Sequence, residues 1–131
     1  MKSLNLLVAL IGLYINPVSA GCFRSGAKWE DREVARQHAL DVCIGDGAVF
    51  DRRWIQGGKI VKKCIQQSPT QRIEFSVGNN EFLTAWGLDP DLCVKGFHNV
   101  INRCSRGGAM DAWVWTFRAD PNKGTCEEAR P

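Results

Sequence analysis

The stretch DPDLCVKGFHNVINRC, residues 89–104, decides the fold. Asp89 is a preferred helix N-cap residue, and the fixed backbone angle of Pro90 suits the first helical position. Apolar residues then recur at intervals of three and four, which places them on one helical face. They are Cys93, Phe97, Val100, Ile101 and Cys104. The spacing predicts an amphipathic helix that carries two cysteines on its buried side and is terminated by Gly107-Gly108.

The segment from Trp29 to Cys43 repeats this pattern. Its apolar positions share one helical face and are Ala35, Ala39, Val42 and Cys43. Acidic residues are enriched at its start, where they complement the positive end of the helix dipole, and Gly45 follows its last residue. We expect a second amphipathic helix, which the disulfide of Cys43 pins to the core.

Two strands are predicted between these helices, over residues 59–67 and 71–78. In the second strand, Ile73, Phe75 and Val77 alternate with polar residues, which gives one buried and one hydrated face. The turn residues Ser68-Pro69-Thr70 separate the two segments. We therefore expect an antiparallel hairpin.

A final strand is predicted around Trp113, Trp115 and Phe117, whose alternation places three aromatic rings on one face. The sequence DPNKG at residues 120–124 is typical of a tight turn, which would bring Cys126 to its partner. Together these elements predict a small disulfide-stapled α+β domain, with helices packed on one face of an antiparallel sheet of about three strands.

Residues 1–20 have the composition of a cleavable secretory signal peptide. Lys2 precedes an apolar run over residues 4–15, Pro17 ends the run, and Val18-Ser19-Ala20 suits signal peptidase. The run is shorter than the roughly 20 apolar residues that a membrane span needs. We expect cleavage before Gly21 and secretion without membrane insertion. The product is expected to be a single extracellular domain over residues 21–131. The sequence leaves open whether this domain is delivered into host tissue or cells.

Six cysteines remain after this cleavage, and an even number in an exported chain predicts three structural disulfides. They are Cys22, Cys43, Cys64, Cys93, Cys104 and Cys126. The sequence leaves their pairing open. No C-x2-C pair is present, and neither His38 nor His98 has a second histidine at ligand spacing, so no metal and no cofactor is expected.

Without Lys2 the chain carries 16 basic and 14 acidic residues and is close to neutral. A nucleic-acid-binding protein normally shows a stronger basic excess or a basic stripe. The densest basic cluster, Lys59, Lys62 and Lys63, is typical of a hydrated strand or turn. We expect no nucleic-acid partner, and the composition leaves the oligomeric state open.

Enzymatic activity is not expected. The cysteines are expected to be oxidised and no G-x-S-x-G elbow is present, so nucleophilic catalysis lacks support. A small secreted ribonuclease is the remaining enzyme alternative, in which Arg72, Glu74 and His98 would supply the arginine, carboxylate and histidine. Arg72 and Glu74 are equally explained as the hydrated face of a strand.

The five tryptophans favour a binding function instead, because aromatic rings stack on the apolar faces of sugars while polar groups bind the hydroxyls. The candidate glycan-binding residues are Trp86, Asp111, Trp113 and Trp115. Trp86 lies in a predicted loop and is expected to be exposed. The alternative for Trp113 and Trp115 is a place in the core. Trp29 and Trp54 are expected in the core or at a helix edge.

Two stretches carry a resemblance to a known family. They are GCFRSGAKW at residues 21–29 and the pattern CSRGG at 104–108 followed by ADPNKGTC at 119–126. With the strand that contains Phe75 and Val77, the sequence resembles small secreted cysteine-rich fungal proteins typified by the glycan-binding lectin of the ink-cap mushroom. The resemblance implies helices followed by a small antiparallel sheet, and binding of fucosylated glycans that contain N-acetylgalactosamine.

The leading expectation is therefore a secreted fungal lectin-like protein that binds glycans on foreign or host cell surfaces. The alternative is a secreted effector, a virulence factor that acts on a host protein without glycan binding. A small ribonuclease is the third hypothesis. The first two differ in whether an exposed aromatic surface meets sugar or protein.

Overall fold

The computed structural model describes residues 21–130, so the predicted signal peptide lies outside the described residues. In this part of the chain one helix precedes four strands, and a second helix precedes two more. The elements are α2 (Arg32–Cys43), β1 (Trp54–Ile55), β2 (Ile60–Ser68), β3 (Gln71–Asn79), β4 (Trp86–Gly87), α3 (Pro90–Arg103), β5 (Gly108–Ala112) and β6 (Trp115–Lys123).

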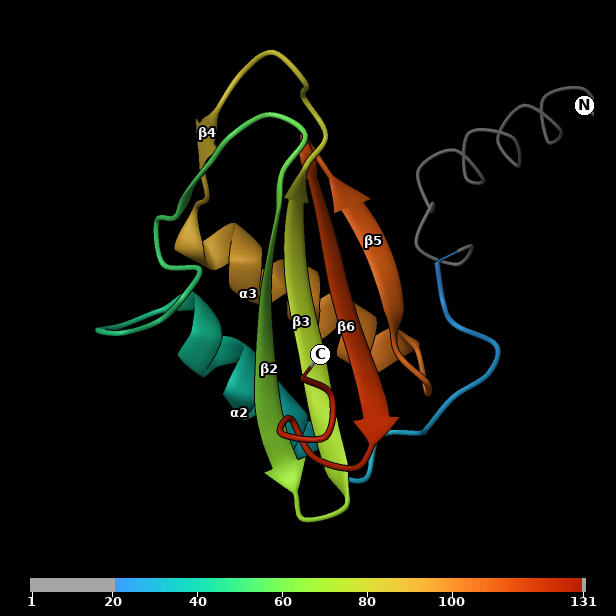
Figure 1. Ribbon diagram of the computed structural model, residues 1–131. Coiled ribbons are helices and arrows are strands. Elements are labelled where there is room, and N and C mark those ends of the chain that lie inside the picture. Colours follow the sequence, from blue (N-terminus) through green and yellow to red (C-terminus); the bar gives the residue numbers. More distant parts are fainter. Residues whose placement is uncertain (1–20, 131) are drawn as a thin grey trace, which may run out of the picture.

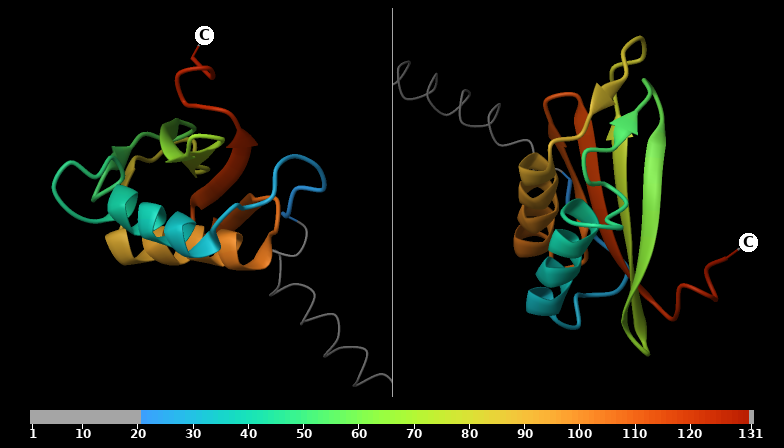
Figure 2. Two further views of the ribbon diagram at one scale, coloured as in Figure 1. Left: turned by 90° about the horizontal axis from the view of Figure 1, so that it is seen from below. Right: turned by 90° about the vertical axis from the view of Figure 1, so that its left-hand side faces the viewer.

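Four of the strands form one antiparallel sheet in the order β2-β3-β6-β5. Helices α2 and α3 pack on the same face of this sheet (Figure 1; Figure 2). The short strands β1 and β4 pair separately at one end of the molecule. The predicted α+β architecture is confirmed, with four strands in the main sheet rather than about three.

Helix α3 forms where predicted, but it ends at Arg103 with Cys104 as its C-cap, and Gly108 begins β5 instead of terminating the helix. The Asp89 carboxylate accepts a hydrogen bond from the backbone N–H of Leu92 at 3.0 Å, and Pro90 is the first helical residue. All five predicted apolar positions are buried. A Cβ atom at Gly96 would lie 2.5 Å from the Phe117 ring, so glycine permits the close approach of this helix to β6.

Helix α2 begins at Arg32, three residues after the predicted start at Trp29. Asp31 caps it by accepting hydrogen bonds from two backbone N–H groups, at 3.0 and 3.1 Å. The four predicted apolar positions are buried. Trp29 precedes the helix, and its indole Nε1 donates to the carbonyl oxygen of Cys104 at 2.7 Å, which anchors the approach to α2.

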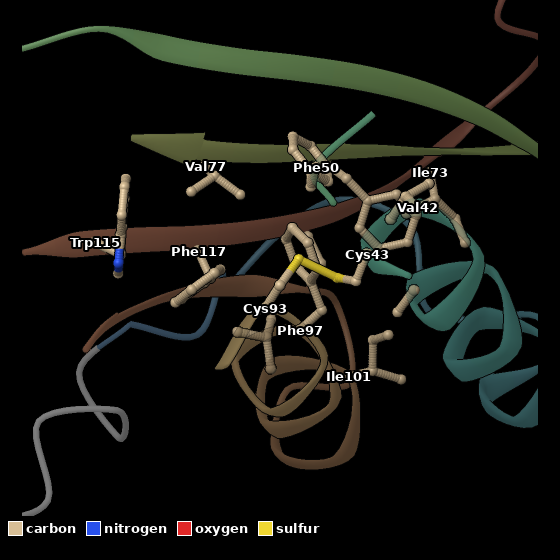
Figure 3. Close-up of a cluster of buried hydrophobic side chains, with 14 of the residues drawn as sticks. Val42, Cys43, Phe50, Ile73, Val77, Cys93, Phe97, Ile101, Trp115 and Phe117 are labelled. Carbon is tan, nitrogen blue, oxygen red and sulfur yellow. A yellow bond between two sulfur atoms is a disulfide. The ribbon is translucent and has the colours of Figure 1, made fainter. Parts of the chain in front are cut away.

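The Phe97 ring lies at the centre of the core (Figure 3). Its centroid is 5.6 Å from that of Phe50, 4.9 Å from that of Phe75 and 5.5 Å from that of Phe117. These rings come from the loop after α2, from β3 and from β6. One residue of α3 therefore contacts every layer of the fold.

The three predicted disulfides are present, and no cysteine among residues 21–130 is free. Cys43–Cys93 joins α2 to α3 inside the core (Figure 3). Cys22–Cys104 ties the N-terminal segment to the end of α3. Cys64–Cys126 ties the C-terminal segment to β2. The expectation that Cys43 pins its helix to the core is confirmed.

The prediction of one strand from Trp113 to Phe117 is wrong. Ala112 pairs with Trp115, so Trp113 and Val114 form a two-residue hairpin turn between β5 and β6. Trp113 has φ 55°, a value that such turns require at a central position. The alternating pattern was misleading because it continues across a turn in which the chain reverses.

The predicted tight turn at residues 120–124 is also wrong, because β6 continues to Lys123. Pro121 pairs with Ile73 of β3, and β5 does not extend to this point of the sheet. The missing N–H of Pro121 therefore removes no hydrogen bond of the sheet. The chain turns at Gly124, which has φ 95°.

The turn between β2 and β3 is clamped by Glu30. Its carboxylate accepts hydrogen bonds from the hydroxyls of Ser68 and Thr70, the latter at 2.7 Å. These hydrogen bonds favour the charged form and hold the pKa of Glu30 below its usual range. The clamp connects the segment before α2 to the far end of the hairpin.

We expect this clamp to weaken as the solution is acidified. A lowered pKa stabilises the fold above the unfolded-state pKa of glutamate, and the contribution is lost as the pH falls through the folded-state pKa of Glu30. In a carboxyl ¹³C NMR titration, combining Ser68→Ala with Thr70→Val should raise the pKa of Glu30. Thr84→Val, which removes a hydroxyl elsewhere, should leave it unchanged. A pKa insensitive to the double substitution would contradict the clamp.

Candidate functional site

Three tryptophans meet at the end of the sheet that carries the β5–β6 turn. We call Trp86, Trp113 and Trp115 the tryptophan cluster. The ring centroids of Trp86 and Trp113 are 4.7 Å apart, and those of Trp113 and Trp115 are 6.5 Å apart. Both pairs are edge-to-face, an arrangement that aromatic rings favour. The structure thus brings together three of the four candidate residues.

The members of the cluster differ in exposure. Trp113 is 67% exposed, Trp86 is half-buried and Trp115 is 1% exposed. Trp115 is therefore a core residue, which agrees with the alternative interpretation of the sequence. Its buried ring contacts the exposed ring of Trp113. A ligand from solution would meet Trp113 first.

Trp113 owes its position to the hairpin turn. Positive φ is uncommon for a bulky residue, so the turn holds Trp113 in a strained conformation. The pairing of Ala112 with Trp115 closes the turn, and the carbonyl oxygen of Val114 accepts a hydrogen bond from the backbone N–H of Asn80 at 2.7 Å. Such strain is concentrated at functional sites in proteins.

Trp86 is positioned by the small β1–β4 ribbon. It pairs with Ile55, and the buried Asn79 side chain donates from Nδ2 to the carbonyl oxygens of Ile55 and Thr84, both at 2.9 Å. The indole Nε1 of Trp86 is covered and has no hydrogen-bond partner among the described residues. The ribbon thus fixes the Trp86 ring beside that of Trp113.

Asp111, the fourth candidate, lies apart from the tryptophan cluster. It is opposite Thr116 on the sheet and accepts a hydrogen bond from that hydroxyl. Asn80 Nδ2 in turn donates to Thr116 Oγ1 at 2.7 Å. This polar chain lies on the sheet face opposite the helices, because neighbouring residues of β6 alternate with the buried Trp115 and Phe117.

Three exposed apolar side chains near this end of the molecule are not among the four candidate residues. Trp54 is 66% exposed rather than buried, and it pairs with Gly87, so it projects from the face of the ribbon opposite Trp86. Phe82 is 82% exposed and Leu83 is 95% exposed in the loop between β3 and β4. The only signal was a run without charge from Phe82 to Leu88.

The three residues of the ribonuclease hypothesis do not converge. Arg72 and Glu74 are side by side on β3, with Nε and Oε2 3.5 Å apart. His98 lies in the helical layer, where its Nε2 is 2.9 Å from the carbonyl oxygen of Arg36 on α2. The sheet separates His98 from Glu74, because Glu74 alternates with the buried Ile73 and Phe75 that face the helices.

No metal centre is apparent in the part of the chain that the structure describes, where no three His, Cys, Asp or Glu side chains are grouped to hold an ion. Within the same residues, neither helix is long and apolar enough to cross a membrane. No protein-family model matches the sequence, and no curated protein matches it. The site is therefore interpreted from its own geometry.

Proposed function

We propose that the protein is secreted and binds glycans, with the tryptophan cluster as its sugar platform. One observation carries this proposal: the Trp113 ring is two-thirds exposed, yet two further tryptophans and a strained hairpin turn hold it in place. A rigid exposed ring suits stacking on the apolar face of a pyranose. It loses little conformational entropy when the ligand binds.

The disulfide-linked fold supports an extracellular site of action. Three bridges in a small domain are typical of proteins that fold in oxidising compartments. The resemblance to secreted fungal lectins agrees with this setting. The proposed ligands are glycans on foreign or host cell surfaces.

Replacing Trp113 by alanine should weaken glycan binding by about tenfold or more, since the loss of one stacking ring removes about 1.4 kcal/mol or more. Trp54→Ala is the matched control: it removes an equally exposed tryptophan from the opposite face of the β1–β4 ribbon. Glycan-array signals followed by calorimetry on the best ligand would measure both, and Trp113→Phe should retain part of the affinity.

Two results would count against this proposal. A blank array from folded protein would remove glycan binding, and equal losses in Trp113→Ala and Trp54→Ala would remove the tryptophan cluster as its site. A blank array would favour the effector alternative, in which the protein acts on a host protein. The exposed Phe82 and Leu83 are the observation that supports this alternative, because adjacent exposed apolar side chains mark protein-binding surfaces.

A further inference from the structure

The sheet face opposite the helices, which we call the open face, contains a groove. Figure 1 looks onto this face, with the helices behind it. A cavity of about 480 Å³ lies over β2, β3 and β6, and a second of about 390 Å³ adjoins it toward the β3–β4 loop. Both are lined by Ile60, Ser76 and Arg118. The first volume alone is in the range of small-ligand sites.

Strand register places two cations in one row across this groove. Lys62 of β2 pairs with Ser76 of β3, and Ser76 pairs with Arg118 of β6. Two strand spacings separate the outer residues, so the backbones of Lys62 and Arg118 are about 10 Å apart. The small Ser76 side chain lies between them and leaves room above the sheet.

The two cations are held differently. The Arg118 guanidinium is 3.5 Å from the Asp120 carboxylate and lies over the Phe23 ring, 4.6 Å from its centroid. These contacts orient the guanidinium before any ligand arrives. Lys62 has no ion pair among the described residues and is exposed. Its charge is therefore available to a ligand.

Two carboxylates form the next row of the groove. Glu74 and Asp120 are directly opposite each other on β3 and β6. Glu74 accepts a hydrogen bond from Asn122 Nδ2 at 2.7 Å and pairs with Arg72, and Asp120 pairs with Arg118. Both carboxylates thus have cationic partners already. Lys62, which pairs with Ser76 on the open face, remains as the lysine that lines the first cavity there without an ion pair among the described residues.

We infer that this groove binds an acidic oligosaccharide, a chain of sugars that carry carboxylate groups. The cation row of Lys62 and Arg118 binds a sugar carboxylate, and the row of Glu74 and Asp120 accepts hydrogen bonds from sugar hydroxyls. Phe82 lines the second cavity and offers an aromatic face to a sugar ring. The groove is separate from the tryptophan cluster, and this inference stands whether or not that cluster binds glycans.

The aromatic content of the groove favours a sugar chain over a nucleic acid. Two aromatic residues, Phe75 and Phe82, are among the described residues that line the groove. Phe75 is buried, so Phe82 is the one aromatic ring there that a ligand can reach. Single-stranded nucleic acids normally stack on several such rings.

The test compares tetragalacturonate with its methyl ester, which has the same sugar chain without the charges. Calorimetry should show binding of the acid form and at least about tenfold weaker binding of the ester, because charge-assisted hydrogen bonds are lost. Lys62→Gln should weaken tetragalacturonate binding about tenfold. Lys95→Gln, which removes the same charge from an exposed position on α3, should leave the affinity unchanged.

Several outcomes would overturn the inference. They are absence of tetragalacturonate binding, equal affinity for the acid and the ester, and equal weakening by Lys62→Gln and Lys95→Gln. Tighter, Lys62-dependent binding of a single-stranded oligonucleotide of equal charge would assign the groove to a phosphate backbone instead. Trp113→Ala should bind tetragalacturonate normally, so a failure of the proposed tryptophan site remains distinguishable from a failure of this one.

Discussion

Replacing Phe97 by alanine should lower the free energy of unfolding by about 3–5 kcal/mol, a large part of the stability of a domain of this size. The Phe97 ring is fully buried and contacts Phe50, Phe75 and Phe117. Its removal leaves a cavity where the helical layer meets the sheet. Because these three rings are fixed by separate elements, the site cannot collapse easily to fill it. Urea unfolding with the disulfides intact would measure the loss.

Two variants test whether the cavity causes this loss. Phe97→Leu keeps much of the side-chain volume and should cost clearly less than Phe97→Ala. Phe82→Ala is the same truncation at an exposed site and should change the free energy of unfolding by no more than about 0.5 kcal/mol. A loss at Phe97 no greater than that at Phe82 would show that the ring is not central to the core.

Removing the Cys43–Cys93 disulfide should be the other costly change, with an expected loss of about 2–5 kcal/mol for the double alanine variant. The bridge connects residues 50 positions apart and constrains the unfolded chain. Both cysteines are also fully buried, so their sulfurs fill space between α2, α3 and the Phe97 ring (Figure 3). The double variant loses both contributions.

The Cys64–Cys126 bridge provides a matched control. Its residues are 62 positions apart, so the loss of chain constraint is nearly the same as for Cys43–Cys93. These sulfurs are only partly buried, because they tie the C-terminal segment to the open face of the sheet. Unfolding of both double variants under the same conditions should therefore show a smaller loss for this pair. Equal losses would mean that sulfur packing adds nothing in the core.

The same architecture leaves two surfaces for binding. The helices cover one face of the main sheet, so ligands can approach the open face and the end of the sheet that carries the tryptophan cluster. Trp113 is presented by a hairpin turn, and Lys62 and Arg118 by strand register. The core that Phe97 organises therefore holds both candidate sites in place, and it supplies Trp115 to the tryptophan cluster.

Helices and buried faces were predictable because their signals are local. Asp89 and Pro90 specify a helix start through the backbone of one turn, and the alternation of Ile73, Phe75 and Val77 specifies a buried face within one strand. The β5–β6 turn was not predictable in this way. Turns of this kind usually have glycine or asparagine at the position with positive φ, but here Trp113 occupies it. The pairing of β5 with β6 overrides this residue preference.

The sequence by itself determined the two helices, the β2–β3 hairpin, the presence of three disulfides and the α+β class, since spacing and composition are properties of short segments. Only the tertiary structure decided which cysteines pair, that Trp115 is buried beneath an exposed Trp113, and that Lys62 and Arg118 share a row above Glu74 and Asp120. These features depend on the register between segments far apart in the chain. That register is set by the packing of the whole core and not by any single stretch of residues.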